Sequence, residues 1–282
     1  MELLQISKTE IDIGLSKEYR FFQISDAHMA NIDESSSEAD KKEHDRSMEA
    51  WKKLKKQFAD EAGEFCDERY NIEANALFEM LASHAVDFNA DALILSGDII
   101  DRVSESNIRY LKKFKNSYKL PIIYCPGNHA HIDESGNHNI KMYERFEGII
   151  DNPEFDVFDF GEFEVVTIDN GTKKITKNQV DRLKKEIEKN KKILLVLHAP
   201  LNIGIFGEEA RKKFNSYFLM PAPTDCEEAH ELAKIIEEND TSFIAVLAGH
   251  IHTSMEYPIT ENLMQYTTSS ALIGYGREII IK

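Results

Sequence analysis

Aspartate, asparagine and histidine residues recur in short polar clusters along this chain, and each cluster follows a run of apolar residues. On its own, each cluster resembles an ordinary turn. Together they offer carboxylate, amide and imidazole groups, a mixture that suits Mn, Fe, Zn or Co better than it suits calcium. The set therefore predicts a metal site. The clusters are Asp26-Ala27-His28, Gly97-Asp98, Gly127-Asn128-His129, His198 and Gly249-His250-Ile251-His252.

Asp98 is the natural residue to bridge two metal ions. A carboxylate carries two oxygens, and the neighbouring Ser96 and Gly97 allow the backbone to come close. Two cations held about 3.5 to 4 Å apart can clamp the attacking and leaving oxygens of an in-line displacement. A dinuclear site of this kind would suit the hydrolysis of a phosphate ester.

The apolar runs before these clusters indicate strands that are buried on both faces. The runs cover residues 21–24, 92–95, 122–124, 193–197 and 243–247. In open α/β sheets, ligands bind at the carboxyl ends of the strands, so the clusters should meet there. Helical spacing of apolar residues predicts helices at 71–86, 104–117, 176–190 and 227–238. The alternation predicts an α/β protein with covered sheets, and residues 255–282 read as antiparallel strands that complete a second sheet.

Taken in order, the motifs from about residue 20 to 252 resemble those of the calcineurin-like metallophosphoesterases, with Gly97-Asp98-Ile99-Ile100-Asp101-Arg102 as the second. The resemblance implies a four-layer α/β/β/α sandwich, in which two mixed β-sheets are flanked by helices. It also implies a dinuclear metal site at one edge of the sandwich. By this resemblance Asp26, His28 and His252 bind the first metal, Asn128, His198 and His250 bind the second, and Asp98 bridges them.

His129 is the catalytic residue that the resemblance implies, since the matching histidine of the family contacts the phosphoryl oxygen and assists the leaving group. The family usually has Asp or Glu after this histidine, whereas this chain has Ala130. A carboxylate there would favour the charged imidazole. Without it, His129 should be a weaker acid unless another group, such as Asp133 or His131, takes its place. The hypothesis is that esters with good leaving groups are turned over better than alkyl phosphates.

Other polar residues near the motifs have open roles. Asp101 could orient a ligand from behind, and Arg102 could pair with Asp101 or reach phosphate, although an ordinary surface ion pair explains both equally well. His131 lies on the loop after the third motif and could approach substrate.

The implied reaction is hydrolysis of a small phosphorylated substrate, a monoester or a diester, by hydroxide held at the metal pair. One alternative is a metal-binding scaffold of the same fold that has no activity. Another is a nuclease that works with a partner subunit. The 34 Lys and Arg against 50 Asp and Glu give a formal charge of −16, which would repel a long polyanion and makes nucleic acid an unfavourable partner.

The length of 282 residues fits one large α/β domain spanning 1–282. An insertion around residues 30–70 begins with a polar loop at 30–46 and leads into a basic stretch at 51–56. The loop could close over the site or remain a surface excursion. The basic stretch, with one Trp and few large apolar residues, fits a solvated helix better than a membrane-binding one.

The compartment and the oligomeric state have little signal in the sequence. Cys66, Cys125 and Cys226 are an odd number without a CxxC pair, so packing thiols are expected rather than disulfides or a zinc ribbon. No signal peptide or long apolar span is visible, so a cytoplasmic location without membrane contact is the expectation. The oligomeric state stays open.

Overall fold

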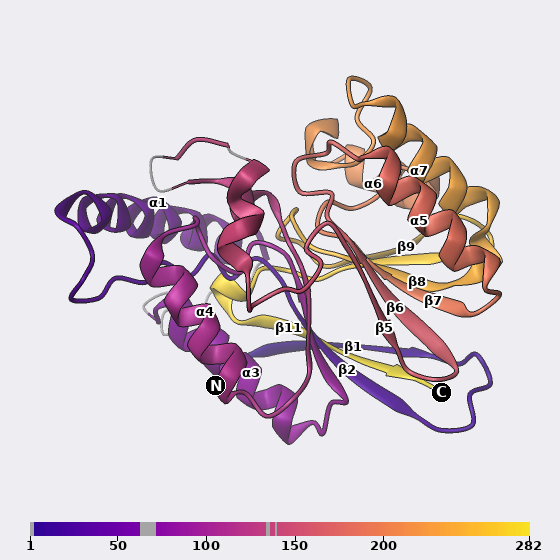
Figure 1. Ribbon diagram of the computed structural model, residues 1–282, viewed down its shortest axis with the longest axis horizontal. Helices are drawn as coiled ribbons and strands as arrows, with labels where there is room; N and C mark the ends of the chain where they lie inside the picture. The colour runs from indigo at the N-terminus through magenta and orange to yellow at the C-terminus, as the bar shows by residue number, and fades with distance from the viewer. Residues whose placement is uncertain (1–2, 63–71, 134–135, 139) are drawn as a thin grey trace.

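Two β-sheets pack face to face in the computed structural model, which describes residues 3–62, 72–133, 136–138 and 140–282 (Figure 1). The first sheet has five strands in the order β1-β11-β2-β3-β4, and the second has six in the order β5-β6-β7-β8-β10-β9. Both contain parallel and antiparallel neighbours, so both are mixed, as predicted. The strands are β1 Gln5–Ile11, β2 Tyr19–Ile24, β3 Ala92–Ser96, β4 Ile122–Cys125, β5 Phe155–Asp159, β6 Phe163–Ile168, β7 Lys192–Val196, β8 Phe243–Ala248, β9 Met255–Pro258, β10 Met264–Thr267 and β11 Tyr275–Ile281.

The central strands are apolar on both faces because each sheet is covered on both sides. In β2, Phe21 packs in the core between the sheets, whereas Phe22 packs in the core under the outer helices. In β7, Leu194 packs in the core between the sheets and Leu195 packs in the core under the outer helices. This arrangement explains why the predicted runs lack an alternation of polar and apolar residues.

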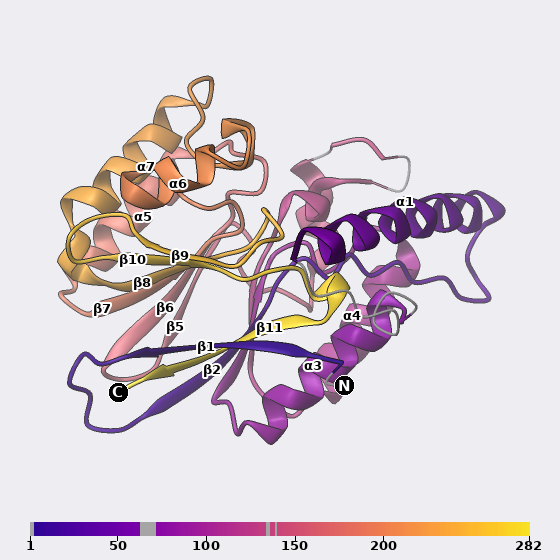
Figure 2. The ribbon, with the colours of Figure 1, turned by 180° about the vertical axis from the view of Figure 1, so that it is seen from behind.

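Helices form the two outer layers and complete the predicted α/β/β/α order (Figures 1 and 2). α3 (Ala74–Asp87) and α4 (Glu105–Ser117) cover the first sheet, and α5 (Lys177–Glu188) and α7 (Glu227–Glu238) cover the second. The four predicted helices are confirmed to within a few residues, although residue 71 lies outside the described residues. Shorter elements are α6 Gly204–Arg211, η1 Asn128–His131, η2 Ile140–Phe146, η3 Ser216–Phe218, η4 Asp240–Ser242 and η5 Ala271–Ile273.

The C-terminal strands divide between the two sheets. β9 and β10 form an antiparallel pair at the edge of the six-stranded sheet, as predicted. β11 instead crosses to the five-stranded sheet and lies between β1 and β2, so the prediction of one continuous second sheet is wrong there. Its apolar residues would suit the interior of either sheet, which is why their pattern does not reveal the partner strands.

α1 (Glu38–Ala62) is a 25-residue helix that begins inside the predicted loop at 30–46. It lies beside η5 and the site edge of the first sheet (Figure 2). Its residue Lys55 is only 5% exposed, and its Nζ donates a hydrogen bond to the carbonyl of Ile72 at 2.7 Å. The expectation of a solvated helix therefore holds for Lys52 and Lys56, which are exposed, but not for the face that carries Lys55.

Two of the cysteines are visible as free thiols, Cys125 buried and Cys226 half-buried. Burial raises the pKa of the Cys125 thiol well above its usual value, which makes it unreactive. Cys66 lies outside the described residues. Within the described ranges, no helix is both long and apolar enough to span a membrane.

Candidate metal centre

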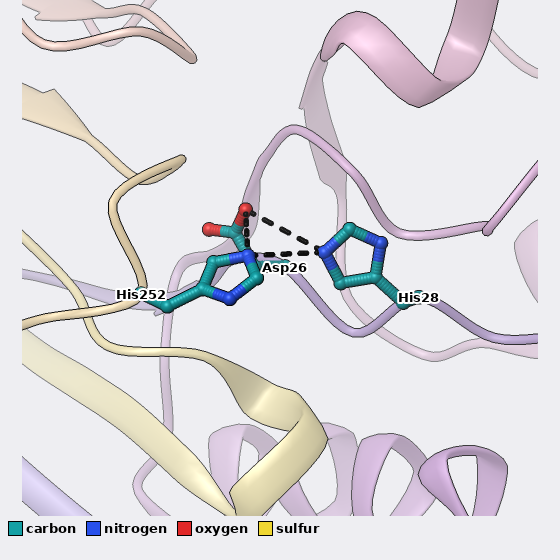
Figure 3. Close-up of side chains that lie close together, drawn as sticks. All are labelled: Asp26, His28 and His252. Carbon is teal, nitrogen blue, oxygen red and sulfur yellow. Dashed lines mark hydrogen bonds and ion pairs between the residues drawn. The ribbon is translucent and has the colours of Figure 1, made fainter. Parts of the chain in front are cut away.

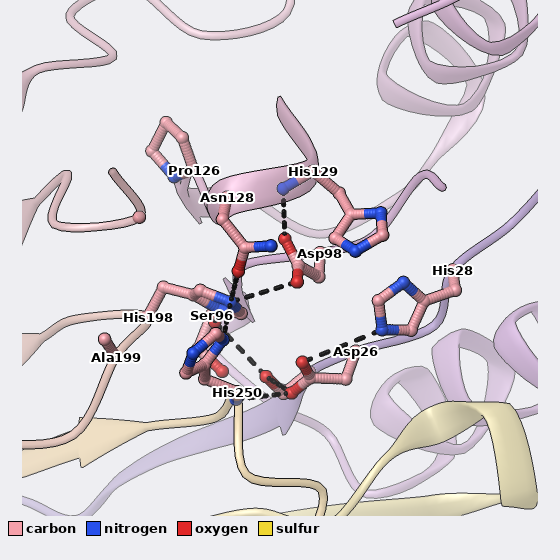
Figure 4. Close-up of polar contacts among 12 residues, drawn as sticks. Asp26, His28, Ser96, Asp98, Pro126, Asn128, His129, His198, Ala199 and His250 are labelled. Carbon is pink, nitrogen blue, oxygen red and sulfur yellow. Dashed lines mark hydrogen bonds and ion pairs between the residues drawn. The ribbon is translucent and has the colours of Figure 1, made fainter. Parts of the chain in front are cut away.

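The carboxyl ends of five strands bring all of the predicted metal ligands to one edge of the sandwich (Figures 3 and 4). Asp26 follows β2, Asp98 follows β3, Asn128 follows β4, His198 follows β7 and His250 follows β8. Potential ligand atoms gather in groups of three, and within each group all the atoms lie within 4.8 Å of one another. The groups share residues, so they form one continuous cluster. The placement agrees with the rule that ligands bind beyond the carboxyl ends of strands.

Asp26, His28 and His252 form the first half of the cluster, and their donor atoms face one another (Figure 3). His252 Nε2 lies 3.2 Å from Asp26 Oδ1 and 3.1 Å from His28 Nε2. Asp26 Oδ1 is buried and has no hydrogen-bond partner among the described residues. A bound cation would give this oxygen and the two nitrogens a common partner, so these residues fit a metal.

Asp98, Asn128, His198 and His250 form the second half. His198 Nε2 lies 3.1 Å from Asp98 Oδ2, 3.0 Å from Asn128 Oδ1 and 3.1 Å from His250 Nδ1. The other nitrogen, Nδ1, lies 2.9 Å from the carbonyl of Ser96. Because a carbonyl only accepts hydrogen bonds, Nδ1 carries a proton and Nε2 is the nitrogen left to bind a metal. Burial lowers the pKa of His198, but the charge of Asp98 outweighs burial and raises the pKa to about 9, so a metal would displace a proton from Nε2.

The backbone is strained at the residues that carry these ligands. Asp26, His28, Asp98, His250 and His252 all have positive φ values, between 46° and 68°. Residues other than glycine seldom adopt this left-handed conformation. Strain of this kind gathers at functional sites, where the surrounding structure maintains it. The rest of the fold therefore holds these residues in an unfavourable backbone conformation, as expected for a functional site.

The protonation states of His28, His250 and the two aspartates suit metal binding. Burial and the nearby His129 lower the pKa of His28 to about 3. Burial and the nearby His198 lower the pKa of His250 to about 3. Both imidazoles are therefore neutral at pH 7. Burial by itself would raise the pKa of Asp26 and Asp98, but neighbouring imidazoles outweigh it and lower both. Ionised carboxylates and neutral imidazoles are the forms that bind metals.

Two glycines let the motif backbones approach one another. A Cβ at Gly97, whose φ is +97°, would lie 2.1 Å from His198 Nδ1. A Cβ at Gly127 would lie 2.3 Å from Asp98 Oδ1 and 2.5 Å from the Asp98 nitrogen. A side chain at either position would displace a proposed ligand. This close approach explains why glycine stands directly before Asp98 and directly before Asn128.

We expect Gly127→Ala to lower kcat about 10- to 100-fold, because moving a reacting group by about 1 Å can have an effect of this size. The measurement is steady-state hydrolysis together with bound metal per chain. Gly14→Ala is the control, since Gly14 has a φ of +77° and no atom within 4 Å of its added Cβ. The control should lose about 1 kcal/mol of stability and keep its activity. Equal activity in both variants would contradict the packing argument.

His129 is held by Asp98 and Asp101. Its backbone N–H donates to Asp98 Oδ1 at 2.8 Å, and its ring Nδ1 donates to the carbonyl of Asp101 at 2.6 Å. The Asp101 carboxylate lies 3.5 Å from the same nitrogen. Burial lowers the pKa of His129, but the charge of Asp98 and the hydrogen bond to Asp101 outweigh burial and raise the pKa to about 9.

Asp101 therefore occupies the place for which Asp133 and His131 were considered, and Ala130 packs in the core instead. Asp101 is 5% exposed, accepts from Trp51 Nε1 at 2.7 Å and pairs with Arg102 at 3.0 Å. Arg102 also contacts the hydroxyl of Ser47 on α1. The two residues join the site to α1, so an ordinary surface ion pair is the wrong description of Asp101 and Arg102.

His131 does not face the cluster. It is 1% exposed, and its Nε2 lies 2.7 Å from Asp169 Oδ2, which also accepts from Tyr143. The expectation that His131 could approach substrate is therefore wrong, because its ring is turned inward and paired.

Three residues near the site were missed by sequence reasoning: Trp51, Asp169 and Asn170. The Asn170 side-chain oxygen accepts from the backbone N–H groups of His198 and Ala199, each at 2.9 Å. Both Asp169 and Asn170 follow β6, so a strand ending in Asp-Asn-Gly was an available signal. No sequence signal pointed to Trp51, because it is distant in sequence from every motif.

Comparison with known proteins gives one family and several similar folds. The model of the calcineurin-like phosphoesterases matches residues 19–254, while no curated protein matches the chain. A dimetal phosphatase from Danio rerio is similar in structure, with a TM-score of 0.52 and 11% identity over 90% of this chain and 88% of that one. A putative 5'-nucleotidase from Staphylococcus aureus gives a TM-score of 0.49 and 10% identity over 90% and 49% of the two chains. At such identities the likeness concerns the fold.

Proposed function

Since this chain belongs to the calcineurin-like phosphoesterase family, and is therefore a metallophosphoesterase, we propose that it hydrolyses small phosphate esters at a dinuclear metal centre. The observation that carries the proposal is the continuous cluster of carboxylate and imidazole groups. In each of three groups the potential ligand atoms lie within 4.8 Å of one another, and the groups are joined because His28 and Asp98 each belong to two of them. Family membership makes the inactive scaffold the weaker alternative.

The proposed ligands divide between two ions. Asp26, His28 and His252 would hold the first, Asn128, His198 and His250 would hold the second, and Asp98 would contact both. When bound, such a pair supplies Lewis acidity toward a phosphate oxygen and a hydroxide nucleophile near neutral pH. Mn, Fe, Zn and Co all suit this donor set.

The residues of the chain position and protonate the ester. With Nδ1 of His129 bonded to the Asp101 carbonyl, Nε2 is the nitrogen left to protonate the departing alcohol oxygen. The buried Asp101 carboxylate stabilises the charged imidazole and fixes its orientation. Proton transfer from a positioned histidine is the contribution that His129 makes to the rate.

A small substrate agrees with the charge of the chain. The formal charge of −16 opposes a long polyanion, whereas a dinuclear cation site attracts a single phosphate group locally. A nuclease would need a partner subunit to supply a basic surface, and its binding would weaken steeply as salt rises.

Metal reconstitution tests the proposed function. Protein stripped by a chelator and reloaded with Mn, Fe, Zn or Co should hydrolyse p-nitrophenyl phosphate or its bis-ester at least about 100-fold faster than the stripped protein. Elemental analysis should find up to two ions per chain. Failure to take up metal and to hydrolyse either reporter with any of the four ions would overturn the proposal.

A further inference from the structure

A cavity of about 260 Å³ lies beside the proposed metal centre, between α1, the start of α3 and η5. We call it the α1 pocket. Met48, Trp51 and Lys55 line it from α1, and Leu272 lines it from η5. His28 also lines it, so this proposed metal ligand belongs to both the cluster and the pocket wall.

Trp51 forms the boundary between the α1 pocket and the imidazoles of the site. Its ring stacks on His28, with centroids 3.9 Å apart and an interplanar angle of 27°. The ring centroids of His129 and His252 lie 6.0 Å away. The indole N–H donates to Asp101, which fixes the ring in this position. The pocket and the site therefore share Trp51 and His28 as a common wall, and His129, which does not line the pocket, lies on the site side of that wall.

The lining of the α1 pocket favours an uncharged, apolar occupant. Met48, Trp51 and Leu272 present thioether, aromatic and aliphatic surface. The one deeply buried cation, Lys55, already donates to the carbonyl of Ile72. The other charged side chains of the lining come in both signs, with Glu49 and Lys52 exposed at the rim.

We propose that the α1 pocket binds the apolar part of the leaving alcohol and so selects esters of apolar alcohols among phosphate esters. The inference rests on the proposed hydrolytic function. Ligand pockets of about 300 Å³ and above hold drug-sized molecules, so a cavity of about 260 Å³ fits a ring or a short alkyl chain. Trp51 lines the pocket, and its ring centroid lies 6.0 Å from that of His129, so the group that the pocket would receive is the leaving alcohol that His129 would protonate.

A series of 4-alkylphenyl phosphates tests the pocket on the metal-loaded protein. Phenyl, 4-ethylphenyl and 4-butylphenyl phosphate release alcohols of nearly equal acidity, so only the apolar size changes. The kcat/KM should rise up to about fourfold per methylene, the ratio that corresponds to about 0.8 kcal/mol per buried CH₂. A flat series in an active enzyme would overturn the pocket and leave the hydrolytic function intact. Failure to hydrolyse any ester would instead sink the hydrolytic function.

Filling the pocket should remove the preference. Met48→Trp adds volume from α1 and Ala74→Leu adds it from α3, and each should reduce the ratio of 4-butylphenyl to phenyl kcat/KM at least about fivefold. Lys56→Ala, on the exposed face of α1, is the matched control and should keep the ratio. An unchanged ratio in both filling variants would contradict the proposal.

Direct binding gives a readout that does not depend on turnover. Trp51 is the only tryptophan of the chain, so its emission, excited at a wavelength that phenols barely absorb, reports on the wall that the pocket shares with the site. Titration with 4-butylphenol should change this emission with an affinity at least about tenfold higher than that of phenol. No change in emission, or equal affinities, would overturn the assignment even in a protein that proved inactive.

Discussion

Replacing Asp98 by Asn is expected to lower kcat at least about 10³-fold. Loss of one electrostatic contact in an active site typically costs about 10²- to 10³-fold. Asp98 would also contact both ions, and it is buried with only 3% of its surface exposed. The amide keeps the shape and can still accept the His129 N–H, but it carries no charge to hold the cations.

The measurement combines kcat with elemental analysis and thermal unfolding. Asp98→Asn should bind fewer ions per chain and remain folded, because the substitution is nearly isosteric. Asp151→Asn is the matched control, since the side chain of Asp151 is 83% exposed. A variant that bound as much metal as the parent and kept its activity would show that Asp98 does not bridge.

The clustering of the proposed ligands was predictable because it depends on strand ends, which have a clear local pattern. Apolar runs buried on both faces mark the parallel strands, and the carboxyl ends of parallel neighbours come to one edge. Asp26, Asp98 and His198 therefore lie together although they are far apart in the chain. The apolar runs that end at these residues predicted that they meet, and the family resemblance supplied their assignment to two metals.

Other parts of the site depend on contacts that have no local pattern. β6 was missed because Glu164 and Thr167 interrupt its apolar run, yet all its residues are buried and the Asn170 that follows it supports His198. Trp51 reaches the site only because α1 folds back over it. The basic residues around Trp51 suggested a solvated helix, and only the tertiary packing reveals its inner face.

The partner of His129 shows the same limit. A neighbour in sequence was expected to supply a carboxylate, and Ala130 removed that neighbour. In the structure, the support comes from Asp101, at the end of the preceding motif. With this carboxylate in place and the pKa of His129 raised to about 9, the histidine is suited to act as an acid. The expected weakness toward alkyl esters should therefore be smaller than Ala130 alone suggests.

His129→Ala is accordingly expected to lower kcat for an alkyl phosphate ester by about 10²- to 10⁴-fold, the usual contribution of general acid catalysis. For a p-nitrophenyl ester the loss should be less than about tenfold, because nitrophenolate departs without a proton. The measurement is kcat for both esters in the parent and the variant. His230→Ala, at an exposed position of α7, is the control and should change neither value.

The loss of kcat for the alkyl ester, compared with the loss for the p-nitrophenyl ester, distinguishes an acid role of His129 from a role as a metal ligand. The donor atoms of His28, Asp98 and His129 also lie within 4.8 Å of one another, so His129 could instead help to hold a metal ion. In that case His129→Ala would reduce bound metal and slow both esters equally, whatever the leaving group. A selective loss for the alkyl ester with unchanged metal content would show that His129 acts on the leaving oxygen, because the two esters differ in how much their leaving groups need a proton or a hydrogen bond.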